Sequence, residues 1–124
     1  MSDNSTAKQL LEAKDAIQEV FDWGQLTWYA NGRLGNSQDM TLGKCVIKSG
    51  CENPRHYHPN CEEALQVIQG EIEHSLGGEL FRMGPGDTIV IPANIVHNAR
   101  NIGADEAVMT IVFSTAERQT VGEV

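Results

Sequence analysis

The sequence has no long hydrophobic run and no excess of positive charge. It holds no stretch of about 18 apolar residues, so no membrane-spanning helix is predicted. The first twenty residues show neither a basic start nor an apolar segment, and we expect no signal peptide. Nine Lys and Arg stand against 17 Asp and Glu, giving a net charge of −8. This charge argues against nucleic acid and anionic membrane surfaces as partners. We therefore expect a cytoplasmic protein.

Cysteines are few, and they lack the spacing of a disulfide framework or of a C-x-x-C pair. The three are Cys45, Cys51 and Cys61, which we expect to be free thiols in a reducing compartment. The sequence also has no G-x-S-x-G, no phosphate-binding loop, no dinucleotide fingerprint and no internal repeat. With 124 residues, 40% of them hydrophobic, the chain is predicted to form one globular domain.

Short apolar runs separated by Gly- and Pro-containing turns dominate the sequence. Strands are predicted at residues 25–30, 40–48, 64–69, 71–76, 79–83, 88–92 and 107–114. The Gly77-Gly78 pair between two of these runs is typical of a β-hairpin. Many short strands at this spacing predict an all-β sandwich or barrel.

The two ends of the chain differ from this pattern. Apolar residues between Ala7 and Phe21 follow a weak helical rhythm, with Ser5 or Thr6 as an N-cap, which predicts a short helix outside the barrel. The predicted division is an N-terminal extension or short helix over 1–24, a barrel over 25–116 and a polar tail over 117–124.

One stretch combines histidines and a carboxylate at a spacing suited to metal binding. His56 and His58 lie two residues apart, so an extended backbone places both on one face, and Glu63 follows five residues later. His97 comes directly after a predicted strand and turn. Three imidazoles and a carboxylate suit one divalent transition metal ion per chain: Fe, Mn, Co, Ni, Cu or Zn. Cys51 and Cys61 lie close by in sequence and are alternative thiolate ligands.

The framing residues of these stretches resemble the two sequence motifs of the cupin family. In the first, G-x5-H-x-H-x4-E-x6-G, the named places are filled by Gly50, His56, His58, Glu63 and Gly70. In the second, G-x5-P-x-G-x2-H-x3-N, they are filled by Gly86, Pro92, His97 and Asn101, with Asn94 where the family usually has glycine. Asparagine tolerates positive φ better than other side chains, so this departure is mild.

The resemblance implies a fold and a set of functions. The implied fold is a single cupin-type double-stranded β-helix, a jelly-roll barrel that holds the metal inside through His56, His58, Glu63 and His97, in a homodimer. The implied function is a metal-dependent enzyme acting on a small oxygen-rich substrate, by isomerase, lyase or dioxygenase chemistry. Two alternatives remain: a non-catalytic module that binds or senses a small molecule, and a closed tetrahedral zinc site that only stabilises the barrel.

His74 is a further candidate for the site. Alternation over residues 71–76 places it on the same inward face as Ile72 and Leu76. It is either a packed, hydrogen-bonded core residue or a catalytic residue that transfers protons near the metal. Among the aromatic residues, Trp23, Trp28, Phe81 and Phe113 are predicted to be core or dimer contacts.

Overall fold

Two antiparallel sheets make up the protein in the computed structural model, which describes residues 9–123. The larger sheet has the strand order β1-β2-β3-β10-β5-β8. Its strands are β1 (Ile17–Phe21), β2 (Gly24–Ala30), β3 (Thr41–Ile47), β10 (Ala107–Phe113), β5 (Glu63–Gln69) and β8 (Thr88–Ile91).

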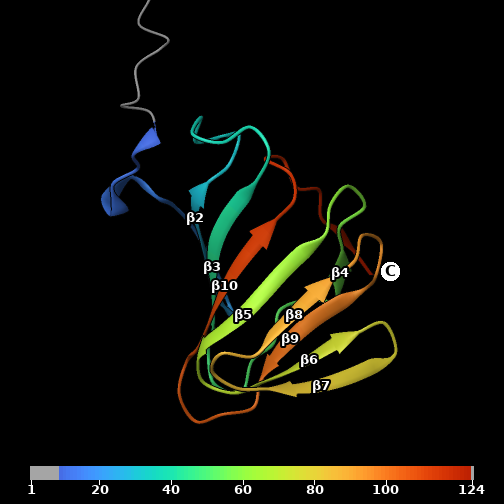
Figure 1. Ribbon diagram of the computed structural model, residues 1–124. Helices are drawn as coiled ribbons and strands as arrows, with labels where there is room; N and C mark the ends of the chain where they lie inside the picture. The colour runs from blue at the N-terminus through green and yellow to red at the C-terminus, as the bar shows by residue number, and fades with distance from the viewer. Residues whose placement is uncertain (1–8, 124) are drawn as a thin grey trace, which may run out of the picture.

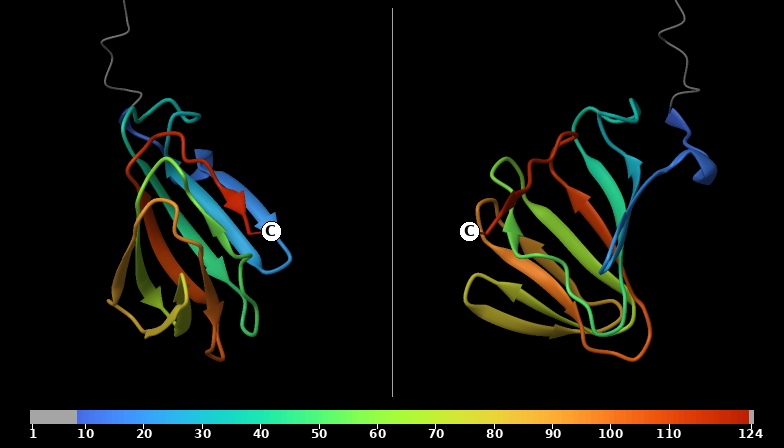
Figure 2. Two further views of the ribbon diagram at one scale, coloured as in Figure 1. Left: turned by 90° about the vertical axis from the view of Figure 1, so that its right-hand side faces the viewer. Right: turned by 180° about the vertical axis from the view of Figure 1, so that it is seen from behind.

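The smaller sheet has the strand order β11-β4-β9-β6-β7. Its strands are β11 (Val121–Gly122), β4 (His56–Tyr57), β9 (His97–Asn101), β6 (Ile72–Leu76) and β7 (Glu79–Met83). Figure 1 shows the two sheets side by side, with the N-terminal strands and the β6–β7 hairpin at opposite edges, and Figure 2 shows the same arrangement from two further directions. The predicted all-β jelly-roll fold is confirmed.

The core lies between the sheets because each strand alternates between inward and outward residues. In β10, Met109, Ile111 and Phe113 are buried, whereas Val112 between them is exposed on the outer face. The same period of two over the other strands gathers the remaining core residues on the inner faces. One end of this interior is packed with aliphatic side chains, and the other carries the histidines.

The predicted strands between residues 25 and 114 are all present, with no end shifted by more than one residue. The loop between β6 and β7 consists of Gly77 and Gly78, as predicted, and only Gly77 has a positive φ, of 59°. No helix within residues 9–123 is long and apolar enough to span a membrane.

The predicted N-terminal helix is wrong over the described part of residues 7–21. Residues 13–15 form a single 3-10 turn, η3 (Ala13–Asp15), and Ile17–Phe21 form β1, which pairs with β2. β-Branched and aromatic residues favour a strand here. Backbone hydrogen bonds to the edge of β2 also stabilise the strand more than the weak helical pattern stabilises a helix. The predicted N-cap at Ser5 or Thr6 lies outside the described residues. The chain thus begins its described part as an extension that adds an edge strand.

Candidate metal site

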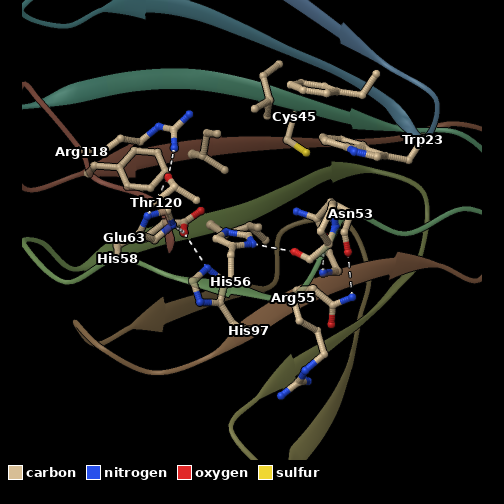
Figure 3. A pocket seen from close by; sticks show the side chains of 18 of the residues that line it. Trp23, Cys45, Asn53, Arg55, His56, His58, Glu63, His97, Arg118 and Thr120 are labelled. Carbon is tan, nitrogen blue, oxygen red and sulfur yellow. Dashed lines mark hydrogen bonds and ion pairs between the residues drawn. The ribbon is translucent and has the colours of Figure 1, made fainter. Parts of the chain in front are cut away.

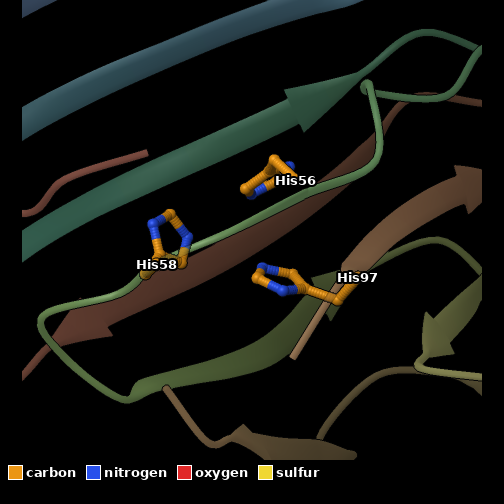
Figure 4. Close-up of side chains that lie close together, drawn as sticks. All are labelled: His56, His58 and His97. Atoms are coloured by element: carbon orange, nitrogen blue, oxygen red, sulfur yellow. The ribbon is translucent and has the colours of Figure 1, made fainter. Parts of the chain in front are cut away.

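Three of the four predicted ligands, the histidines, come together from two segments of the chain, and Glu63 lies beside two of them. His56 in β4 and His97 at the start of β9 are direct partners across the smaller sheet. His58 follows β4, and Glu63 opens β5 in the facing sheet. One ligand nitrogen of each histidine lies within 4.8 Å of the others, so the three could hold a metal ion. Figure 4 shows the three rings gathered around one point.

Backbone carbonyl groups fix the orientation of all three rings. The Nδ1–H of His56 donates to Pro54 O (2.7 Å) and that of His97 to Ile95 O (2.9 Å). The Nδ1–H of His58 donates to Gln119 O (2.8 Å). Because a carbonyl oxygen only accepts, each Nδ1 must carry the proton, and in a neutral ring Nε2 is then a free lone pair. Metal-binding histidines are commonly oriented by this kind of contact.

The Nε2 atoms of His58 and His97 face the Glu63 carboxylate and, in neutral rings, have no proton to share with it. Glu63 Oε1 lies 3.2 Å from Nε2 of His97 and 3.3 Å from Nε2 of His58. His58 Nε2 is buried and has no hydrogen-bond partner within the described residues. Acceptors that converge in a buried place repel one another unless a cation lies between them. The donor set of three imidazole nitrogens and one carboxylate oxygen therefore fits a divalent transition metal ion.

Burial and neighbours shift the ionisation of the site. Burial alone raises the pKa of Glu63, but hydrogen bonds and charge from the His58 and His97 rings, when these carry a proton on Nε2, outweigh it and bring the pKa down to about 2. Burial lowers the pKa of His56 to about 4. Both shifts favour the forms that bind metals, a carboxylate and a neutral imidazole.

The site opens into a cavity of about 330 Å³ between the sheets. Figure 3 shows the histidines at its wall together with Trp23, Cys45 and Arg118. Much of the remaining wall is apolar, formed by Phe21, Trp23, Leu26, Trp28, Leu65, Ile111 and Phe113. The prediction that Trp23, Trp28 and Phe113 are core or dimer contacts thus misses that they also line this cavity. Phe81 is not among the lining residues.

His74 lies in the cavity wall, on the inward face of β6 as the alternation predicts. It is 1% exposed, and its ring lies parallel to that of His97, with the ring centroids 5.8 Å apart. Its Nδ1 has no hydrogen-bond partner within residues 9–123. Burial lowers its pKa to about 4, which keeps the ring neutral at neutral pH.

The turn before β9 explains why Asn94 replaces the glycine of the second motif. Asn94 has a φ of 70°, the left-handed region, and its N–H donates to His58 O (3.0 Å). The turn that delivers His97 is therefore tied to the loop that carries His58. Gly70, the last residue of the first motif, has a φ of 88°, and a Cβ there would lie 3.0 Å from Ala107 Cα.

The cysteines do not join the metal group. All three are free thiols, and the clustered ligand atoms within residues 9–123 are those of histidines alone. Burial raises the pKa of Cys45 to about 12 and also raises that of Cys61, so both remain protonated at neutral pH.

Sequence reasoning missed the part that the C-terminal segment plays. Gln119 O accepts from His58, Thr120 Oγ1 lies 3.3 Å from the same Nδ1, and Arg118 lines the cavity. These residues lie about sixty positions from His58 in a polar stretch with no apolar pattern, so no signal in the sequence pointed to them.

A family model for the cupin domain matches residues 43–113, more than half of the chain. The protein belongs to the cupin family. Among curated proteins, this cupin is 33% identical over 84 residues to polyketide synthase CurC of Streptomyces cyaneus, covering 67% of this chain and 54% of that protein. It is 28% identical over 88 residues to oxalate oxidase 1 of Hordeum vulgare, covering 64% and 44%. The chain thus spans about half the length of these relatives.

Solved structures with the same fold include an oxalate decarboxylase from Lactobacillus farciminis in a formate complex. The TM-score is 0.84 at 21% identity, covering 90% of this chain and 35% of that one. An oxalate oxidase structure gives 0.83 at 22% identity, covering 98% and 67%. At these identities the likeness supports the fold alone.

Proposed function

We propose that this cupin is a metal-dependent enzyme whose ion is held by Nε2 of His56, His58 and His97 and by Glu63. The observation that supports it most is the set of ring nitrogens that converge beside a buried carboxylate while their Nδ1 atoms are bound to carbonyl groups. A bound divalent ion would supply a Lewis acid or a site for O2.

The cavity favours an open site over a closed structural one. All four proposed ligands line it, so a ligand that enters would meet the ion directly. A closed zinc tetrahedron stabilises a fold without needing such a space. The cavity is also the reason to prefer an enzyme or a binding module to a structural site.

The lining indicates the shape of the substrate. Relatives and neighbours named for oxalate chemistry suggest a small acid as one candidate. An apolar cavity of about 330 Å³ instead favours a substrate with an apolar body and two oxygen donors at one end. His74 lines this cavity and has one ring nitrogen without a hydrogen-bond partner within residues 9–123, and it would hydrogen-bond the substrate beside the metal.

Metal content of two histidine variants tests the ligand assignment. The chain has four histidines, all in this site, so His74→Ala is a matched control for His97→Ala. We expect about one ion per chain by elemental analysis for the wild type and His74→Ala, and well below one for His97→Ala. Full occupancy in His97→Ala would show that the ligand assignment is wrong.

Cobalt loading then separates an open site from a closed one. An open five- or six-coordinate Co²⁺ gives weak visible absorption that changes when a small chelating acid is added, whereas a closed tetrahedral ion gives strong absorption that does not respond. Turnover on a panel of hydroxy acids, dicarbonyl compounds and oxalate, with dissolved oxygen recorded, tests catalysis. Ligand-responsive spectra without turnover of any panel compound would favour the binding module.

A further inference from the structure

Arg118 is a cation in the wall of an otherwise largely apolar cavity. It lies between β10 and β11 and lines the same space as the proposed metal ligands, as Figure 3 shows. The guanidinium carbon is 4.3 Å from the ring centroid of Trp28 and 5.3 Å from that of Phe113. Contacts with two aromatic faces hold the side chain in one place.

The nearby carboxylates are engaged elsewhere. Glu63 contacts His58 and His97, and Glu19 accepts a hydrogen bond from Trp28 Nε1 at 2.7 Å. The one hydrogen bond that the guanidinium makes within residues 9–123 goes to Thr120 Oγ1, and it has no ion pair there.

Three of the four other arginines of the chain show the contrast, whereas Arg33 likewise has no ion pair within residues 9–123. Arg55, Arg82 and Arg100 each pair with a glutamate, at 2.9, 2.8 and 3.0 Å. Arg118 is half-buried, and its guanidinium makes one hydrogen bond within residues 9–123, so its other N–H groups are available to an anion. In a protein of net charge −8, it places a positive charge in a cavity wall that also holds Glu19, Glu63 and Arg55.

We propose that Arg118 binds a carboxylate of the substrate, which makes the substrate an organic acid with an apolar body. This inference rests on the proposed function for the role of the cavity as a substrate site. Phe113 lies between the two polar groups, since His58 packs edge-on against its ring (5.1 Å between centroids) and Arg118 lies over it. An acid bound at Arg118 would therefore lay its apolar part along Phe113 and reach the metal ligands with its other oxygen atoms.

Calorimetry on metal-free protein tests the proposal with two probes of the same shape. Benzoate carries the carboxylate and benzamide is its neutral counterpart, and at about pH 8 His56 is uncharged. Arg118 also borders a second cavity lined by Asn31, Arg33 and Glu117, so an apolar probe is chosen to report on the first. We expect wild-type protein to bind benzoate about tenfold or more tightly than benzamide.

Three variants complete the test. Arg118→Gln should remove the preference for benzoate and leave benzamide affinity unchanged, and Arg118→Lys should restore part of the preference, because it keeps the charge but loses the planar fork. Arg82→Gln, on the exposed surface, should behave as the wild type. Thermal unfolding of each variant checks that it is folded. If Arg118→Gln does not fold, the preference for benzoate over benzamide is compared between the wild type and Arg118→Lys.

Equal affinity for the two probes in wild-type protein, or an unchanged preference in Arg118→Gln, would overturn the proposal. So would the absence of benzoate binding at about 10 mM. Metal content, measured separately, distinguishes failure of the Arg118 proposal from failure of the proposed function. A protein that discriminates the probes but takes up no metal keeps the anion site and loses the metal-dependent enzyme. A protein that loads metal but binds benzoate and benzamide equally keeps the metal-dependent enzyme and loses the anion site.

Discussion

Each of the three clustered histidines is oriented by a carbonyl group from a different part of the chain. Pro54 and Ile95 serve the residues two positions after them, whereas Gln119 serves His58 from a distant segment. A neutral ring fixed in this way carries its proton on Nδ1 and its lone pair on Nε2. The rings are therefore oriented before any ion binds. This fixed arrangement is unfavourable in free energy in the metal-free protein, because ring lone pairs and a carboxylate face one another.

Burial of the histidine rings predicts a pH dependence for metal-free protein. Burial lowers the pKa of His56 and His74 from an ordinary 6.5 to about 4. Between these values the unfolded chain binds more protons than the folded one, so the free energy of unfolding should fall as pH drops from 6.5 to 4. Glu63, with its pKa lowered from 4.5 to about 2, extends the loss below pH 4.5.

Urea denaturation across this pH range measures the effect. His74→Leu should flatten the dependence between pH 6.5 and 4, because one of the two titrating rings is then absent. A denaturation midpoint that stays constant over this range in the wild type would contradict the prediction.

Cys61 gives a second prediction at the level of single residues. Its thiol is buried with a raised pKa and lies outside the histidine cluster, so Cys61→Ser should leave metal content unchanged. Elemental analysis beside the wild type checks this. A clear loss of metal, in a variant that still unfolds cooperatively, would support thiolate ligation instead.

The sequence predicted the clustered histidines, the carboxylate beside them and the inward position of His74, because motif spacing and strand alternation are local patterns. It predicted a turn at Asn94 for the same reason. It could not predict Arg118, since what gives this residue its position is stacking on Trp28 and Phe113, and neither contact follows from neighbours in sequence.

At the level of elements, the C-terminal segment forms a strap beside the candidate metal site. We define the strap as residues 117–122; it ends in β11, which pairs with β4. Asn60 holds the strap with two hydrogen bonds, donating to Glu117 O and accepting from Gln119 N, both at 2.9 Å. The same Gln119 orients His58, so Asn60 is linked through the strap to a proposed metal ligand.

Asn60→Ala should therefore weaken metal binding as well as the fold. Loss of two hydrogen bonds should lower the free energy of unfolding by about 1–2 kcal/mol. Loosening the partner of His58 should lower metal affinity by on the order of tenfold, measured by competition with a chelator.

Asn36→Ala is the matched control for this variant. Asn36 also makes two hydrogen bonds to backbone, with Tyr29 O and Asn31 N, in a loop outside the cavity. It should lose similar stability and keep its metal affinity. Equal metal affinity in both variants would show that the strap does not support His58.

The N-terminal and C-terminal strands show why element prediction fails at the ends of this chain. β1 and β11 exist because an open sheet edge offers them backbone partners, at β2 and β4. Their own sequences carry only a weak pattern, so the pairing that creates them is visible only in three dimensions. The division into extension, barrel and tail stays a prediction.

For the whole molecule, the outer face of the larger sheet bears on the predicted homodimer. Leu42, Val112, Ala64 and Val90 stand in one row across β3, β10, β5 and β8. Leu42 and Val112 are 37% exposed and Val90 is 54% exposed. An apolar row across four strands suits contact with a second copy of the chain.

Val112→Glu should therefore convert the predicted dimer to a monomer, because it places a charge in the middle of this row. Leu80→Glu, an equivalent change at an exposed residue of the smaller sheet, should leave the dimer intact. Sedimentation velocity measures both. A wild-type protein that sediments as a monomer would show that the homodimer prediction is wrong.

Both tryptophans of the chain, Trp23 and Trp28, line the cavity. Their emission therefore comes entirely from the wall of the site, with no background from tryptophans elsewhere. A compound that enters displaces water beside an indole, and a paramagnetic ion at the histidines would quench the same light. The protein carries its own optical reporter, and libraries of unlabelled acids can be screened for binding before any reaction is known.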